Sequence, residues 1–283
     1  MKQVVISADS TCDLSPALIE KYHITILPLS VILGEEVRTD GVDVKPEDLF
    51  AFVDRTGTLP KTSAVTIASY LDFFNKMKEE GKEVVHICIS SKFSCCYQNA
   101  CLAAEESGNA FVVDSYNLST GSGHLVVEAA LMAEEGLGAE EIAGRLKEIV
   151  PLVDASFVID AIPYLYKGGR CSGTAAFGAN LLKIKPCIEV RDGAMCVGKK
   201  YRGKMQDVIR TYVDDRLNQP GVSIKKDRVF ITHTCVHPEL VEIAWQEVKK
   251  AGLFAEILET RAGSTVSSHC GPDTLGVLFI REK

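Results

Sequence analysis

A cluster of serine hydroxyls directly follows a mostly apolar stretch, residues 84–89. The stretch is rich in β-branched side chains and predicts a buried strand of a parallel sheet. Ser90, Ser91 and Ser94 come next, and from Tyr97 the apolar positions recur at helical spacing, so Ser94 lies where a helix N-cap belongs. Ligands of parallel sheets bind where the strands end, and a helix N-terminus favours an anion. Without a glycine-rich loop, the pattern predicts a small anion such as a carboxylate; alternatively, Ser94 only caps its helix.

Further polar side chains fall in segments that the pattern predicts as loops, where functional residues are often found. These residues are Thr62, Ser63, Arg170, Arg202 and His269. Ser94 or Cys95 together with His269 would supply a nucleophile and a base, so a hydrolase remains an alternative, although the chain has no Gly-x-Ser-x-Gly motif. Neither a phosphate-binding loop nor a dinucleotide fingerprint follows the first strand.

Strands and helices alternate with short connections up to residue 150. This order predicts an N-terminal α/β domain, residues 1–152, with a parallel sheet and helices on both faces. After Pro151 the pattern changes, because Asp192-Gly193 suits a type I′ hairpin turn between residues 187–190 and 195–198. A hairpin among helices predicts a C-terminal α+β domain with a mixed sheet, residues 153–283.

The same patterns give approximate bounds for the elements. Further strands are expected at residues 3–8, 24–33 with a bend or an edge at Pro28, 110–114, 157–162, 229–232, 255–258 and 277–280. Helices are expected to begin at Ser15-Pro16 and to span residues 46–55, 66–80, 119–135, 139–150, 203–217 and 238–251. Residues 59–64 are expected to form a loop, and Gly121-Ser122-Gly123 a site of close helix packing.

Composition excludes several classes of protein. The 283 residues are 46% hydrophobic and carry a net charge of −7, which argues against nucleic acid as a partner. The ten cysteines include no Cys-x-x-Cys pair, so we expect buried thiols and no metal. No apolar run approaches the roughly 20 residues of a membrane span, and the first residues do not resemble a signal peptide. We therefore expect a cytoplasmic protein.

Several short motifs, spread over nearly the whole chain and in the same order, resemble the DegV family. The residues that carry the resemblance are 8–14 (Ala-Asp-Ser-Thr-Cys-Asp-Leu), Lys61-Thr62-Ser63, Ser90-Ser91-Lys92-Phe93-Ser94, Asp114-Ser115, Lys167-Gly168-Gly169-Arg170, Tyr201-Arg202 and His269-Cys270-Gly271-Pro272. Each motif alone is weak, but the Thr-Ser segment, the serine turn and the Gly-Gly-Arg run together are specific.

The resemblance implies a two-domain protein that binds a long-chain fatty acid in a tunnel between the domains. It implies a lipid-binding subunit without a cofactor, which presents the carboxylate to an ATP-binding fatty acid kinase subunit for acyl phosphate formation and contacts a membrane at most transiently. By resemblance, Thr62, Ser63 and Ser94 bind the carboxylate, Arg202 and His269 lie near the head group, and Arg170 faces the kinase.

The chain departs from the family pattern at three places near these motifs. Cys95-Cys96 replaces Gly-Thr after the serine turn, Ala64-Val65 replaces Gln-Pro, and Asp273 replaces a glycine. The first change removes a flexible residue and a hydroxyl beside the predicted anion site. Two alternatives stay open: a Ser94- or Cys95-dependent hydrolase of acyl or small carboxyl substrates, and a lipid carrier without a kinase.

Overall fold

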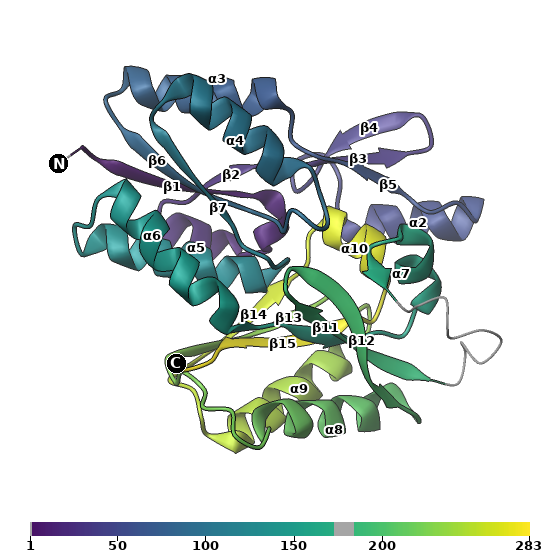
Figure 1. Cartoon of the computed structure of the whole chain (residues 1–283). Helices are drawn as coiled ribbons and strands as arrows, with labels where there is room; N and C mark the ends of the chain where they lie inside the picture. The colour runs from purple at the N-terminus through teal and green to yellow at the C-terminus, as the bar shows by residue number, and fades with distance from the viewer. Residues whose placement is uncertain (1, 173–183) are drawn as a thin grey trace.

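The computed structural model describes residues 2–172 and 184–283 and contains a fully parallel sheet near the N-terminus (Figure 1). The strand order is β2 (Thr25–Leu27), β1 (Val4–Asp9), β6 (Glu83–Cys88) and β7 (Ala110–Asp114). Helices α3 (Ile67–Glu79) and α4 (Cys96–Ser107) cover one face, and α5 (Thr120–Glu134) and α6 (Ala139–Ile149) cover the other. Because β6 is buried on both faces, its sequence is almost continuously apolar. The predicted doubly covered parallel sheet is confirmed.

A small antiparallel sheet branches from this domain, and it differs from the sequence prediction. Pro28 and Leu29 divide the expected strand 24–33 into β2 and β3 (Ser30–Leu33), which belong to different sheets. The expected loop at 59–64 contains β5 (Lys61–Ser63), which pairs with β3, while β4 (Glu36–Thr39) pairs on the other side. Thr62 and Ser63 therefore lie on a strand, and predicting them as loop residues was wrong. Helices α1 (Pro16–Lys21) and α2 (Pro46–Thr56) complete this half.

The second half is built on a mixed sheet, as predicted. Its strand order is β10 (Cys171–Ser172), β12 (Ala194–Tyr201), β11 (Lys185–Arg191), β9 (Ser156–Val158), β15 (Leu275–Ile280), β13 (Arg228–His233) and β14 (Glu256–Arg261), with β8 (Val153–Asp154) paired to β15. Helices α8 (Met205–Leu217) and α9 (Pro238–Ala251) cover one face. Asp192 and Gly193 join β11 to β12 with φ angles of 49° and 79°, which confirms the type I′ turn.

Two short helices depart from the expected pattern. The expected strand 157–162 ends early, because β9 stops at Val158 and α7 (Ile162–Gly168) begins with a proline in its first turn. Helix α10 (Ser264–Cys270) was not expected, since its sequence is rich in serine and β-branched residues that are poor helix formers. His269 accordingly lies in the last turn of a helix, not in a loop as predicted.

Helix α5 is packed between the two sheets, and its first eleven residues are all buried. A Cβ at Gly123 would lie 2.8 Å from the carbonyl oxygen of Cys12, so the glycine allows a close approach, as predicted. On its other side, α5 contacts the mixed sheet: the His124 Nε2 atom lies 3.0 Å from the Leu278 carbonyl oxygen, and Glu128 pairs with Arg228. The two halves thus share one buried layer.

The connection between the halves runs through the 3-10 helix η2 (Val150–Leu152) and enters β8 at Val153. The boundary expected between residues 152 and 153 stays a prediction. In the described parts of the chain, no helix combines the length and the apolar character needed to cross a bilayer.

Candidate functional site

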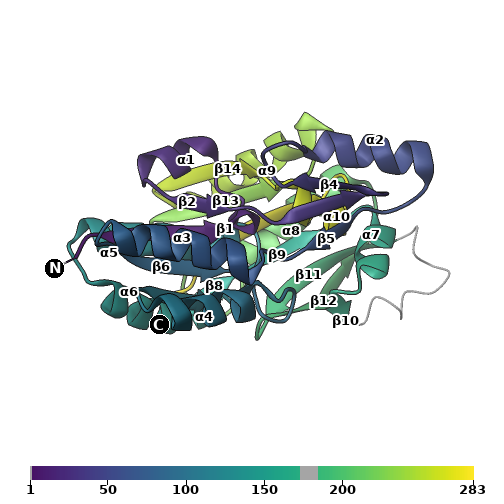
Figure 2. The same cartoon turned by 90° about the horizontal axis from the view of Figure 1, so that it is seen from above.

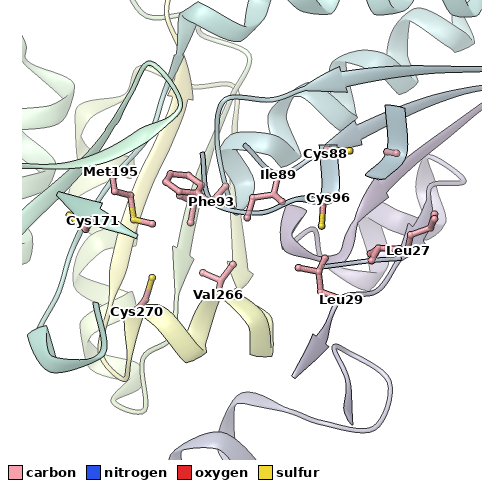
Figure 3. Close-up of a cluster of buried hydrophobic side chains, with 14 of the residues drawn as sticks. Leu27, Leu29, Cys88, Ile89, Phe93, Cys96, Cys171, Met195, Val266 and Cys270 are labelled. Carbon is pink, nitrogen blue, oxygen red and sulfur yellow. The ribbon is translucent and has the colours of Figure 1, made fainter. Parts of the chain in front are cut away.

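A cavity of about 600 Å³ lies between the end of β6, the small sheet, α10 and the β11–β12 hairpin. Its volume is typical of small-molecule binding sites. One part of its wall is apolar: Ile89 and Phe93 from the first half face Met195, Val266 and Cys270 from the second (Figure 3). Further apolar lining residues are Leu29, Ala64 and Leu118. Both halves of the fold therefore line the same space.

The polar part of the wall joins β5 to α10, which lie next to each other (Figure 2). A hydrogen bond of 2.9 Å connects Thr62 Oγ1 to His269 Nε2. Burial, and secondly the nearby charge of Arg170, lower the pKa of His269 to about 4. The imidazole is therefore neutral at pH 7. Its Nδ1 atom is buried and has no hydrogen-bond partner within residues 2–172 and 184–283.

Ser94 lies in the cavity wall just before α4. The N-cap of α4 is Cys95, so the prediction that Ser94 caps the helix was wrong by one residue. Its hydroxyl still bonds the helix terminus, because Ser94 Oγ accepts a hydrogen bond from the Cys96 N–H at 3.3 Å. The same hydroxyl donates to Cys96 Sγ at 3.2 Å. Sulfur is a weak acceptor, so the hydroxyl can redirect this hydrogen bond to a stronger anionic acceptor at little cost.

The two adjacent cysteines, Cys95 and Cys96, lie in different environments. Cys96 is fully buried, and burial raises the pKa of its thiol to about 12. Cys95 is exposed and lines the cavity. Within the described residues, neither Ser94 nor Cys95 has a histidine as a hydrogen-bond partner, because His269 bonds Thr62 instead. The contacts thus do not assemble the nucleophile and base that a hydrolase would need.

Of the other predicted residues, some line the cavity and others do not. Ser63, Ser91 and Arg170 line the cavity, and the exposed Arg170 donates to the Gly168 carbonyl oxygen at 2.7 Å. Ser90 does not line it; its hydroxyl donates to the Gly193 carbonyl oxygen at 2.7 Å and links the two halves. Arg202 is exposed after β12 and is not among the described residues of the cavity wall.

Several lining residues were not predicted to be functional. Met195 and Leu118 have no local pattern that distinguishes them from core residues, and Thr265 and Val266 lie on the unexpected helix α10. Only the packing of distant segments brings them together. No sequence signal beyond their hydrophobicity or their proximity to the His269 motif could have identified them.

Asp9, His86 and Cys88 form a buried group with ligand atoms within 4.8 Å of one another. The Asp9 carboxylate already accepts hydrogen bonds from Tyr70 Oη at 2.5 Å and from the Ile89 N–H at 2.9 Å. His86 lies 3.2 Å from Asp9 and 2.9 Å from Ser7 Oγ. Asp9 and His86 thus belong to a connected hydrogen-bond network that fixes the end of β6.

Comparison with known proteins covers the whole chain. The family described as "Uncharacterised protein, DegV family" matches residues 3–282. The DegV domain-containing protein of Clostridium acetobutylicum is 34% identical over 287 residues, which cover 100% of both chains. A Thermotoga maritima protein named "Fatty acid-binding protein" is 32% identical over 282 residues, or 97% of this chain and 96% of the relative.

A solved structure shows the same fold. A DegV family protein from Thermus thermophilus, described as binding fatty acid, superposes with a TM-score of 0.89 at 27% identity. The superposition covers 99% of this chain and 100% of that one.

The neutral state of His269 has a measurable consequence. As the pH falls from about 6.5 to about 4, the unfolded chain binds a proton that the folded His269 does not bind, so the free energy of unfolding decreases. We expect His269→Gln to remove on the order of 3 kcal/mol of this decrease, as measured by urea unfolding over that pH range. The exposed His23→Asn is the control. An identical pH slope in His269→Gln and the parent protein would contradict the neutral imidazole.

Gly168 leaves room for this imidazole, because a Cβ at Gly168 would lie 2.7 Å from His269 Nδ1. We expect Gly168→Ala to lower the free energy of unfolding by about 1–3 kcal/mol through overpacking. Gly144→Ala on α6, where the Cβ meets nothing within 4 Å, should be neutral or stabilising. Thermal unfolding of both variants decides this, and equal melting temperatures would show that Gly168 is not needed for space.

Proposed function

Because this chain belongs to the DegV family, we propose that its cavity binds a long-chain fatty acid with the carboxylate at Thr62 and Ser94. The observation that carries the proposal is one cavity with an apolar wall from both halves and with hydroxyl groups beside an imidazole at its polar side. The fatty acid binding described for the Thermotoga and Thermus proteins supports it.

The energetics favour such a ligand. An acyl chain of about sixteen carbons gains on the order of 0.8 kcal/mol per buried methylene, or about 10 kcal/mol before ordering costs are subtracted. The carboxylate loses hydration and needs hydrogen-bond donors in return. Thr62 and Ser94, with Ser63 beside them, supply hydroxyls, and His269 holds Thr62 in place. Neutral donors leave an oxygen of the carboxylate more reactive than a bidentate arginine would.

We further propose that the protein is not itself the catalyst and presents this carboxylate to an ATP-binding kinase subunit. A carboxylate oxygen would attack the terminal phosphorus of ATP on the partner, and ADP would leave, which yields an acyl phosphate. The exposed Arg170 and Lys92 line the cavity, so they can approach a docked partner and its phosphates. Arg202 is exposed as well and remains part of this proposal as a residue near the head group.

We place this function in the cytoplasm. The buried thiols of Cys12, Cys88, Cys96 and Cys270 are free, and the exposed Cys95 is free as well. Such thiols persist where the environment is reducing.

The first experiment identifies the ligand. Protein purified from a bacterial host should release fatty acid on denaturation, as measured by mass spectrometry of the extract. Thr62→Ala/Ser94→Ala should reduce the retained fatty acid roughly tenfold or more, because two hydrogen bonds to a buried charge are lost. Thr211→Ala on the exposed side of α8 is the control. Unchanged lipid content in the double variant would refute the assigned carboxylate site.

The second experiment separates a kinase subunit from a simple carrier. Arg170→Glu should lower acyl phosphate formation with an ATP-binding kinase subunit while the bound fatty acid is retained. Lys250→Glu, an exposed reversal on α9, should leave both unchanged. If Arg170→Glu forms acyl phosphate at the parent rate, Arg170 does not face the partner. Hydrolysis of an activated acyl ester that Cys95→Ala abolishes would instead support the hydrolase.

A further inference from the structure

Helix α10 supplies Thr265, Val266, His269 and Cys270 to the cavity wall, yet its own sequence does little to stabilise it. It spans only seven residues, and its N-cap is Gly263, which has no side chain to bond the free N–H groups. Acceptors outside the helix must therefore bond the free backbone N–H groups at its N-terminus.

Two carboxylates from the first half of the chain do this. The Gly263 N–H donates to Asp13 Oδ1 at 2.8 Å, and the Ser264 N–H donates to Asp40 Oδ1 at 2.8 Å. Asp13 is 5% exposed and Asp40 is 3% exposed, so water cannot replace either contact. Neither residue is part of the cavity wall among the described residues.

The second oxygen of each carboxylate is bonded as well. Ser119 Oγ donates to Asp13 Oδ2 at 2.5 Å, and Ser119 is the N-cap of α5. Ser10 Oγ donates to Asp40 Oδ2 at 2.8 Å and accepts from the N–H of Leu29, a cavity residue, at 3.1 Å. The carboxylates are thus fixed to the N-terminus of α5 and, through Ser10, to the cavity residue Leu29.

The contact is also tight. A Cβ at Gly263 would lie 3.2 Å from Asp13 Oδ1 and 3.2 Å from Asp40 Oδ1. Any larger residue would have to push the carboxylates away from the helix, because Cβ contacts this short are uncommon.

We propose that Asp13 and Asp40 are positioning residues for the head-group end of the cavity. They hold the N-terminus of α10 so that His269, at its other end, meets Thr62. This proposal rests on the proposed function, because its test measures the affinity for a fatty acid. It adds that two residues outside the cavity determine the geometry of the carboxylate site.

Ionisation of Asp13 makes the positioning of α10 depend on pH, and this dependence can be measured. Burial, with a contribution from the charge of Asp40, raises the pKa of Asp13 to about 8. Among the residues that the structure describes, the ionisable groups that face Asp13 are Asp40, Cys12 and Cys270, and none of these three is a cation. Near pH 7 Asp13 therefore carries a proton on Oδ2, which then donates to Ser119 Oγ, while Oδ1 still accepts from the Gly263 N–H; above pH 8 it ionises beside Asp40. The cost of burying this charge, together with repulsion from Asp40, outweighs the stronger hydrogen bonds that the ionised carboxylate accepts from Gly263 and Ser119, so the hold on α10 loosens.

The test uses the full chain and the fluorescent fatty acid cis-parinaric acid. We expect Gly263→Ala to weaken binding roughly threefold or more, since displaced carboxylates shift α10. It should also shift the ring ¹⁵N resonances of His269, assigned with His269→Gln. Gly144→Ala, the matched control, should change neither quantity.

The pH profile distinguishes positioning from general stability. Affinity of the parent protein should fall between pH 7 and pH 9, and Asp13→Asn should abolish this fall, whereas Asp207→Asn on α8 should keep it. A Gly263→Ala protein with a lower melting temperature but unchanged affinity and unchanged His269 resonances would overturn the proposal. If the parent protein binds no probe, the proposed function fails, and the His269 resonances of Gly263→Ala alone then decide whether the pair positions α10.

Discussion

The proposed site depends on a single electrostatic constraint: a carboxylate that follows an apolar chain into a protein loses its hydration. In the proposed complex, hydrogen bonds from uncharged side chains offset the lost hydration energy. Burial keeps His269 uncharged, so the imidazole orients Thr62 and does not itself form an ion pair. On the opposite wall, Ser94 donates a hydrogen bond to the weak acceptor Cys96 Sγ, and the hydroxyl can donate to a carboxylate instead. We propose that such a site binds the anion without neutralising its reactivity.

This arrangement requires both halves of the fold. Thr62 lies on β5 and His269 on α10, and 207 positions separate them in the sequence. Helix α5 keeps the halves together because it is buried against both sheets. The carboxylates of Asp13 and Asp40 set α10 against the first half at the same interface. The cavity is therefore a property of the interface and not of either sheet alone.

The sequence predicted the parts that local patterns determine. The doubly covered parallel sheet and the hairpin at Asp192-Gly193 follow from periodicity and turn chemistry, and both are present. The predictions that were wrong concern features that depend on contacts between residues far apart in the sequence. Residues 61–63 form a strand because they pair with β3, and α10 is helical because Asp13 and Asp40 cap it across more than 200 positions. Ser90 was assigned to an anion site, but its partner is the distant Gly193 carbonyl, which no local pattern reveals.

The most direct measurement is a crystal structure of the protein with a bound saturated fatty acid. We expect density for the carboxylate within hydrogen-bond distance of the Thr62 and Ser94 hydroxyls, and for the acyl chain between Phe93 and Val266. We also expect the hydrogen bond between His269 and Thr62 to be retained in the complex. A carboxylate placed away from these hydroxyls, or side chains that fill the space between the two halves, would contradict the proposed function.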